Sequence, residues 1–149
     1  MTWTELETST YQDHVIKHVL GATVLGWVLI EDALHALLDV GLLWTIYING
    51  EMGLMAQSVA IEDLETEQLD HAEIMKLTSD AQRLMSEGRE AERLLRFTGA
   101  PVDCTIVAVE VFACDSQRRV VIVGETAAIE VEMSQEPCKF KIDCLIAPA

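Results

Sequence analysis

The stretch that decides the fold is residues 43–55, LWTIYINGEMGLM, in which two apolar segments flank the dipeptide Asn49-Gly50. Asn-Gly readily adopts the positive φ angles of a type I′ turn, a common two-residue connection between antiparallel strands. Aromatic and β-branched residues dominate the first segment, which favours a strand over a helix. We therefore predict a β-hairpin here, with a two-residue type I′ turn at its tip.

Upstream of this hairpin, the pattern predicts a short helix, a strand and a second helix. Residues 10–20 begin with a Thr-x-x-Asp capping pattern and end at Gly21, as a helix commonly does. Residues 22–30 are apolar on both alternating faces, which is typical of a strand covered on both sides. Residues 31–41 begin with two acids, carry leucines on one side and end at a glycine, so we expect a helix there.

The centre of the chain, residues 63–97, changes to a helical period. Apolar or small residues recur every seven positions and form one stripe, with charged residues opposite it. Ser79 and Gln82 have the spacing of a capping box, so the segment is either one long helix or two helices joined near Thr78. The stripe fits packing against a sheet or against a second copy of the chain.

The last third of the chain has the pattern of a four-stranded antiparallel meander. The expected strands cover residues 102–114, 118–123, 127–133 and 139–146. In the last two, apolar and charged residues alternate. A register that places Glu132 opposite Lys139 and Val131 opposite Phe140 matches charged with charged and apolar with apolar side chains, so we expect that pairing.

These elements together predict an α+β protein with an antiparallel or mixed sheet, on which one long or two consecutive helices pack. The sheet combines the amino-terminal strand, the Asn-Gly hairpin and the carboxy-terminal meander. The length of 149 residues fits a single domain, and any subdivision would fall into residues 1–61, 62–98 and 99–149. A rival interpretation makes residues 11–40 a helical hairpin.

The chain is strongly acidic, with 25 acids against 10 bases and a formal net charge of −15. Residues 1–75 hold most of this charge, because they carry thirteen acids and Lys17 as their single base. The excess argues against binding to nucleic acid or to an anionic membrane, and it leaves a cationic protein as a conceivable partner.

Several features favour a cytoplasmic protein. The longest uncharged apolar run, residues 19–30, is shorter than the roughly 20 residues that cross a bilayer as a helix. The first ten residues hold two acids and no base, unlike the start of a signal peptide. We therefore expect the four cysteines to be reduced.

Histidines supply the candidate metal ligands. His14 and His18 are four residues apart, so both imidazoles lie on one face of the first helix. Asp32 and His35 complete a mixed carboxylate and histidine shell if the fold brings the two segments together. A pair at this spacing is also common on a solvated helix edge. The sequence contains no nucleophile elbow, phosphate-binding loop or dinucleotide fingerprint, so we expect no catalysis and no cofactor.

Aromatic side chains suggest a further site. Trp27, Trp44 and Tyr47 form a candidate pocket for a small apolar ligand, although such residues are more often ordinary core.

A mean hydropathy of +0.24 implies more apolar area than a lone domain of this size readily hides. We therefore expect a homodimer or higher oligomer, with an interface around Leu77, Leu84 and Leu95 on the helical stripe. The leading functional hypothesis is a non-catalytic, homo-oligomeric binding module; the alternatives are a metal-dependent enzyme or sensor and a small apolar-ligand-binding protein.

Overall fold

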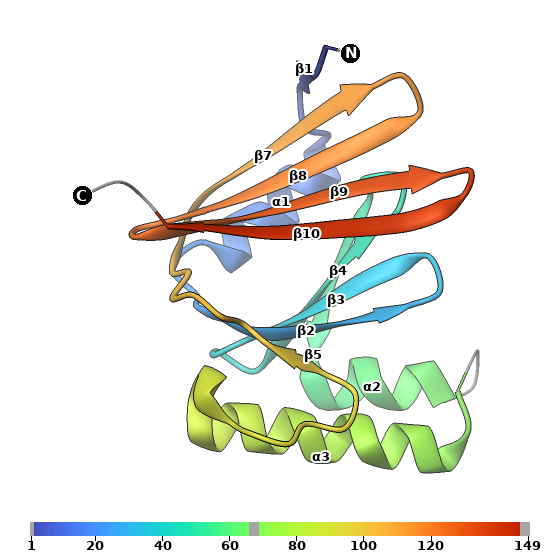
Figure 1. Cartoon of the computed structure of the whole chain (residues 1–149), viewed down its shortest axis with the longest axis vertical. Helices are drawn as coiled ribbons and strands as arrows, with labels where there is room; N and C mark the ends of the chain where they lie inside the picture. Colours follow the sequence, from blue (N-terminus) through green and yellow to red (C-terminus); the bar gives the residue numbers. More distant parts are fainter. Residues whose placement is uncertain (1, 66–68, 147–149) are drawn as a thin grey trace.

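The structure is a computed structural model, and it describes residues 2–65 and 69–146. Two antiparallel five-stranded sheets and a pair of helices stack as three layers (Figure 1). The outer sheet has the order β1 (Thr4–Leu6), β7 (Ile106–Cys114), β8 (Gln117–Gly124), β9 (Ala127–Gln135) and β10 (Cys138–Ile146). The middle sheet has the order β5 (Met52–Ala56), β4 (Leu42–Tyr47), β3 (Ala33–Leu38), β2 (Val24–Ile30) and β6 (Thr98–Gly99).

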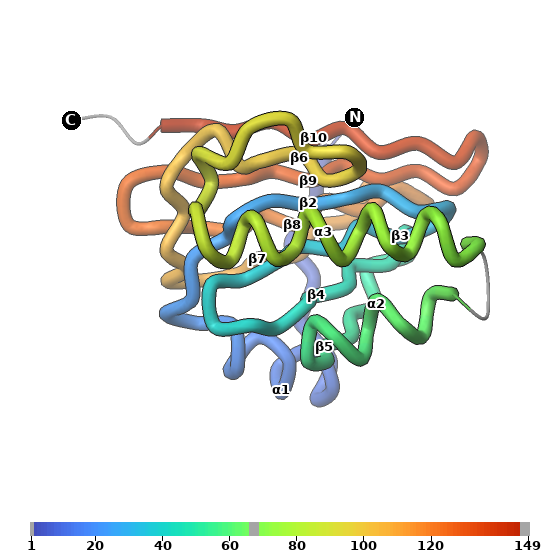
Figure 2. The backbone as a smooth tube through the Cα atoms, turned by 90° about the horizontal axis from the view of Figure 1, so that it is seen from below, coloured from blue at the N-terminus to red at the C-terminus, as the bar shows by residue number. Residues whose placement is uncertain are grey.

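Among the described residues, three α-helices complete the fold, which confirms the α+β class. Helices α2 (Gln57–Glu65) and α3 (His71–Glu87) cover one face of the middle sheet, and a 3₁₀ turn, η1 (Gly88–Glu90), follows α3. Helix α1 (Thr10–Val19) lies along the side of the two sheets near β5, at the opposite side of the molecule from β10 (Figure 2). The expectation of one combined sheet is wrong, because the amino-terminal hairpins and the carboxy-terminal meander lie in two separate sheets.

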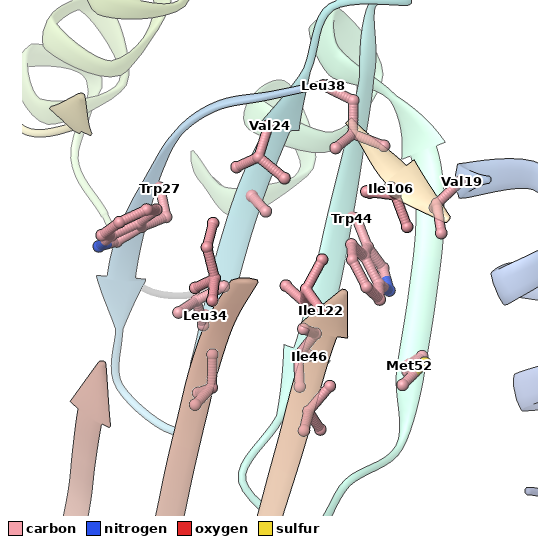
Figure 3. Close-up of a cluster of buried hydrophobic side chains, with 14 of the residues drawn as sticks. Val19, Val24, Trp27, Leu34, Leu38, Trp44, Ile46, Met52, Ile106 and Ile122 are labelled. Carbon is pink, nitrogen blue, oxygen red and sulfur yellow. The ribbon is translucent and has the colours of Figure 1, made fainter. Parts of the chain in front are cut away.

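The middle sheet is buried on both faces. Its side toward the outer sheet carries Leu34, Trp44 and Ile46, which belong to a core shared by the two sheets (Figure 3). Its other side carries Leu37 and Leu43, which belong to a second core with α2 and α3. A strand covered on both faces is apolar along most of its length. The prediction of such a strand over residues 22–30 is confirmed by β2.

Residues 31–41 are wrongly predicted as a helix, because they contain strand β3. Every residue of β3 is buried, three on the side of the outer sheet and three on the side of the helices. The two acids preceding it form the tip of the β2–β3 hairpin, where Glu31 adopts a positive φ of 50°. The rival helical hairpin over residues 11–40 is wrong for the same reason.

The hairpin around Asn49-Gly50 is confirmed, but its turn differs from the predicted type I′. The N–H of Gly50 donates to the carbonyl of Tyr47 at 2.8 Å, and Gly50 alone of the Asn-Gly pair has a positive φ, +91°. This is the pattern of a type I turn followed by a glycine bulge. The Asn49 side chain accepts the N–H of Glu51 at 3.0 Å, which favours this arrangement.

The helical centre consists of two helices, but the predicted joint near Thr78 is wrong. The predicted bounds, residues 63–97, also differ, because α2 begins at Gln57 and the helical part ends at Glu90. Thr78 lies inside α3, where its hydroxyl donates to the Ile74 carbonyl at 2.9 Å. The side chain of Asp70 accepts the N–H of Glu73 and so caps the start of α3. Gly88, with a φ of +75°, ends the helix.

The four-stranded meander is confirmed, with a register shifted by two residues from the predicted one. Lys141, rather than Lys139, lies opposite Glu132, and Phe140 lies opposite Met133. The strands extend to Gln135 and Cys138, which leaves a two-residue connection between them. A shift of two residues preserves the face of every side chain, which is why the alternation alone does not reveal it.

Candidate functional site

His14 and His18 meet on the exposed face of α1, as their spacing predicts. Their ring centroids are 4.7 Å apart, and Nδ1 of His18 lies 2.8 Å from the carbonyl oxygen of His14. Both rings border an open hollow of about 370 Å³, together with Tyr11, Val15 and Leu54. The helix is held in place from its start, because Ser9 and Gln12 form a reciprocal capping box, rather than the predicted Thr10 and Asp13.

His35 and Asp32 lie elsewhere. His35 occupies the side of β3 that faces α2 and α3, whereas α1 packs into the core on the opposite side of the middle sheet. Its Nδ1 lies 2.9 Å from the Thr45 hydroxyl, and burial lowers the pKa of His35 to about 4, although the charge of Asp32 opposes this shift. The fold therefore does not bring the four residues into one site. Across residues 2–65 and 69–146, no group of three or more His, Cys, Asp or Glu side chains could hold a metal ion.

The aromatic residues of the candidate pocket divide between core and surface. Trp27 and Trp44 belong to the core between the two sheets (Figure 3), and Trp44 is fully buried. Tyr47 ends β4 and is 41% exposed. Within the described chain, the indole N–H of Trp44 has no hydrogen-bond acceptor. Both tryptophans thus contribute mainly to packing.

The three leucines of the candidate interface divide in a similar way. Leu77 and Leu84 are fully buried in the core between α3 and the middle sheet. Leu95 lies beyond η1 and is 60% exposed. The chain's own sheet therefore covers the helical stripe.

The outer sheet presents a row of interacting side chains on the face that points away from the middle sheet. The Arg119 guanidinium carbon lies 4.3 Å from the centroid of the Trp3 ring, and Nε of Arg119 donates to Oε1 of Glu132 at 3.1 Å. Glu132 lies opposite Lys141 on β10. A shallow hollow of about 150 Å³ lies beside Glu132 and Lys141 and includes Lys139. These charges are largely paired within the row.

Strand β10 forms the edge of the outer sheet, a position that no pattern in the sequence predicts. The order of the described strands ends at β10, which pairs with β9 alone. Near its carboxyl end, Leu145 is 48% exposed and Ile146 is 78% exposed. On its outward face, Nζ of Lys141 lies 3.8 Å from Oδ2 of Asp143. The edge therefore combines unpaired backbone groups, apolar side chains and both signs of charge.

No protein-family model, curated protein or solved structure matches this chain. Within the described residues, no helix is both long and apolar enough to cross a membrane.

Proposed function

We propose that the protein is a non-catalytic interaction module that works as a homodimer, in which β10 of one copy pairs with β10 of a second. The observation that carries this proposal is the nine-residue edge strand, Cys138–Ile146. An uncovered edge strand offers a row of backbone N–H and carbonyl groups to another strand. The dimer would join two outer sheets into one continuous sheet.

The other described edges suit this role less well. β1 has three residues and β6 has two, so neither offers a long row of backbone groups. β5 has five residues and lies beside α1 and α2. β10 is therefore the edge with the most free backbone.

Charge on β10 favours an antiparallel pairing with a second copy centred on Ile142. In that register, Lys141 of each copy lies opposite Asp143 of the other, so two opposite-charge pairs form across the dimer axis. A shift of the centre by one residue toward Lys141 sets the two copies of Lys141 against each other, and a shift toward Asp143 opposes the two carboxylates. Like charges directly opposite one another destabilise a sheet, which disfavours both shifted registers. The shift toward Lys141 also sets Lys139 opposite Asp143, but it leaves the last two residues of β10 unpaired in each copy, whereas the register centred on Ile142 pairs all nine.

Apolar side chains favour the same register. Phe140, Ile142 and Cys144 are half-buried and pack against the core between the two sheets. In the proposed pairing, Ile142 meets Ile142 of the second copy, and Phe140 meets Cys144. The core of each copy would continue across the interface, which buries further apolar area.

Exchange of the two charges tests the pairing. Lys141→Asp or Asp143→Lys alone turns both opposite-charge pairs into like-charge pairs. We expect either variant to raise the dissociation constant of the dimer about tenfold or more. The double variant Lys141→Asp/Asp143→Lys restores opposite charges and should restore the dimer. Light scattering and sedimentation over a range of concentrations measure the effect.

A matched control is Lys139→Asp, which makes the same change of charge on the same face of β10. In the proposed register Lys139 lies opposite Leu145 of the second copy, so we expect a much smaller change in dimer dissociation. A monomer throughout the micromolar range, or a double variant no better than the single ones, would overturn the proposal. We also propose that the protein lies in the cytoplasm, which suits its free thiols.

A further inference from the structure

We infer that His14 and His18 chelate a divalent transition-metal ion such as Zn²⁺ or Ni²⁺ on the exposed face of α1. The two imidazoles lie four residues apart on one helix face, with ring centroids 4.7 Å apart. Imidazole nitrogens at this spacing can bind one ion between them. The inference does not depend on the dimer, because α1 lies on the other side of the molecule from β10 (Figure 2).

The hydrogen bond of His18 prepares its ring for a metal. A backbone carbonyl can only accept, so Nδ1 of His18 carries the proton that it donates to His14 at 2.8 Å. In the neutral ring this leaves the lone pair on Nε2, which points away from the helix backbone. A donated Nδ1–H to a carbonyl is the arrangement that orients metal-binding histidines and increases their basicity.

The surroundings suit a cation with open coordination positions. Both rings border the hollow of about 370 Å³, which leaves room for water or a ligand from solution to complete the coordination shell. Nitrogen ligands select late transition metals over Mg²⁺ and Ca²⁺, which prefer oxygen.

Calorimetric titration with zinc chloride and nickel chloride tests the inference. The measurement uses the full chain with Cys138→Ser, because the exposed thiol of Cys138 is itself a metal ligand. We expect one ion per chain, and about tenfold or greater loss of affinity in His14→Gln and in His18→Gln. Both side chains are exposed, so these variants should fold.

The matched control is His71→Gln, which removes an exposed histidine at the start of α3 and should leave the affinity unchanged. A second readout is the nitrogen NMR spectrum of the imidazoles: we expect His18 as the Nδ1–H tautomer, with its Nε2 signal displaced by the metal. Absence of saturable binding at submillimolar metal, or binding that survives loss of either His14 or His18, would overturn the inference.

Discussion

The carboxylate of Asp80 accepts the backbone N–H of Phe97 at 2.8 Å, and this bond ties the middle of α3 to the segment that enters β6. The same carboxylate accepts the backbone N–H of Leu95 at 2.8 Å and that of Arg96 at 2.5 Å. Asp80 is only 1% exposed. Three backbone donors thus share one buried acceptor, which fixes the path of the chain between α3 and the middle sheet.

Asp80→Ala should therefore be among the most destabilising substitutions in the chain. It leaves three backbone N–H groups without their acceptor, so we expect a loss of about 2–4 kcal/mol in the free energy of unfolding. Urea denaturation followed by circular dichroism measures it. Asp70→Ala is the matched control, because Asp70 is exposed and accepts a single N–H at the start of α3. Its expected cost is about 1 kcal/mol, and equal costs for the two variants would contradict this account.

Gly26 is required by a close approach between β2 and β6. A Cβ atom at this position would lie 2.6 Å from the Thr98 carbonyl oxygen and 3.1 Å from Cδ1 of Leu84. Gly26→Ala should therefore force β6 away from β2 and cost about 1–3 kcal/mol. Gly53→Ala is the control in β5, where the nearest atoms lie 3.9 Å from the added Cβ. Thermal denaturation should show a lower Tm for Gly26→Ala alone; an unchanged Tm would argue against the close contact.

The parts of the fold that the sequence predicts are those whose pattern is local. Helix α1, the hairpin at Asn49-Gly50 and the four carboxy-terminal strands depend on turns, helix ends and alternation within a few residues. The prediction for β3 is wrong for the same reason: it uses a local pattern, and two acids followed by leucines resemble the start of a helix. A strand buried on both faces shows no alternation that would contradict this interpretation.

Among the candidate sites, too, the sequence predicts only those features that depend on a local pattern. The proximity of His14 and His18 follows from helical spacing alone. The position of His35 depends on which side of the middle sheet it faces, which is determined by its pairing with Val28 and Thr45. The edge position of β10 depends on the order of strands in a sheet, and a single sequence does not encode that order in any short pattern.

Thiol labelling should distinguish the buried cysteines from the exposed one. Cys104 is fully buried, and burial together with the nearby Cys144 raises the pKa of its thiol to about 11. Cys138 is exposed on the edge strand. The thiolate is the reactive form, so a disulfide reagent at neutral pH should modify Cys138 first and Cys104 only after unfolding. Mass spectrometry of the labelled peptides identifies each site, with the denatured chain as the control. Equal labelling rates in the folded protein would contradict the buried position of Cys104.

The stability of the fold should decrease as the pH falls below neutral, through His35. Burial lowers the pKa of this imidazole from 6.5 to about 4, so the folded protein resists a proton that the unfolded chain accepts. The contribution of His35 is therefore complete above pH 6.5, decreases as the pH falls, and levels off below about pH 4. The total effect is on the order of 3 kcal/mol.

Two variants distinguish the effect of protonating His35 on stability from the effect of its hydrogen bond to Thr45. His35→Gln retains a polar partner for Thr45 but does not titrate, so its free energy of unfolding should change less between about pH 6.5 and pH 5 than that of the unmodified chain. Thr45→Val removes the hydroxyl and leaves the imidazole, so it should lower stability throughout this range while the dependence on pH remains. Urea denaturation at several pH values measures both. If His35→Gln kept the full pH dependence, another group would be responsible for it, because the side chain of Gln does not titrate.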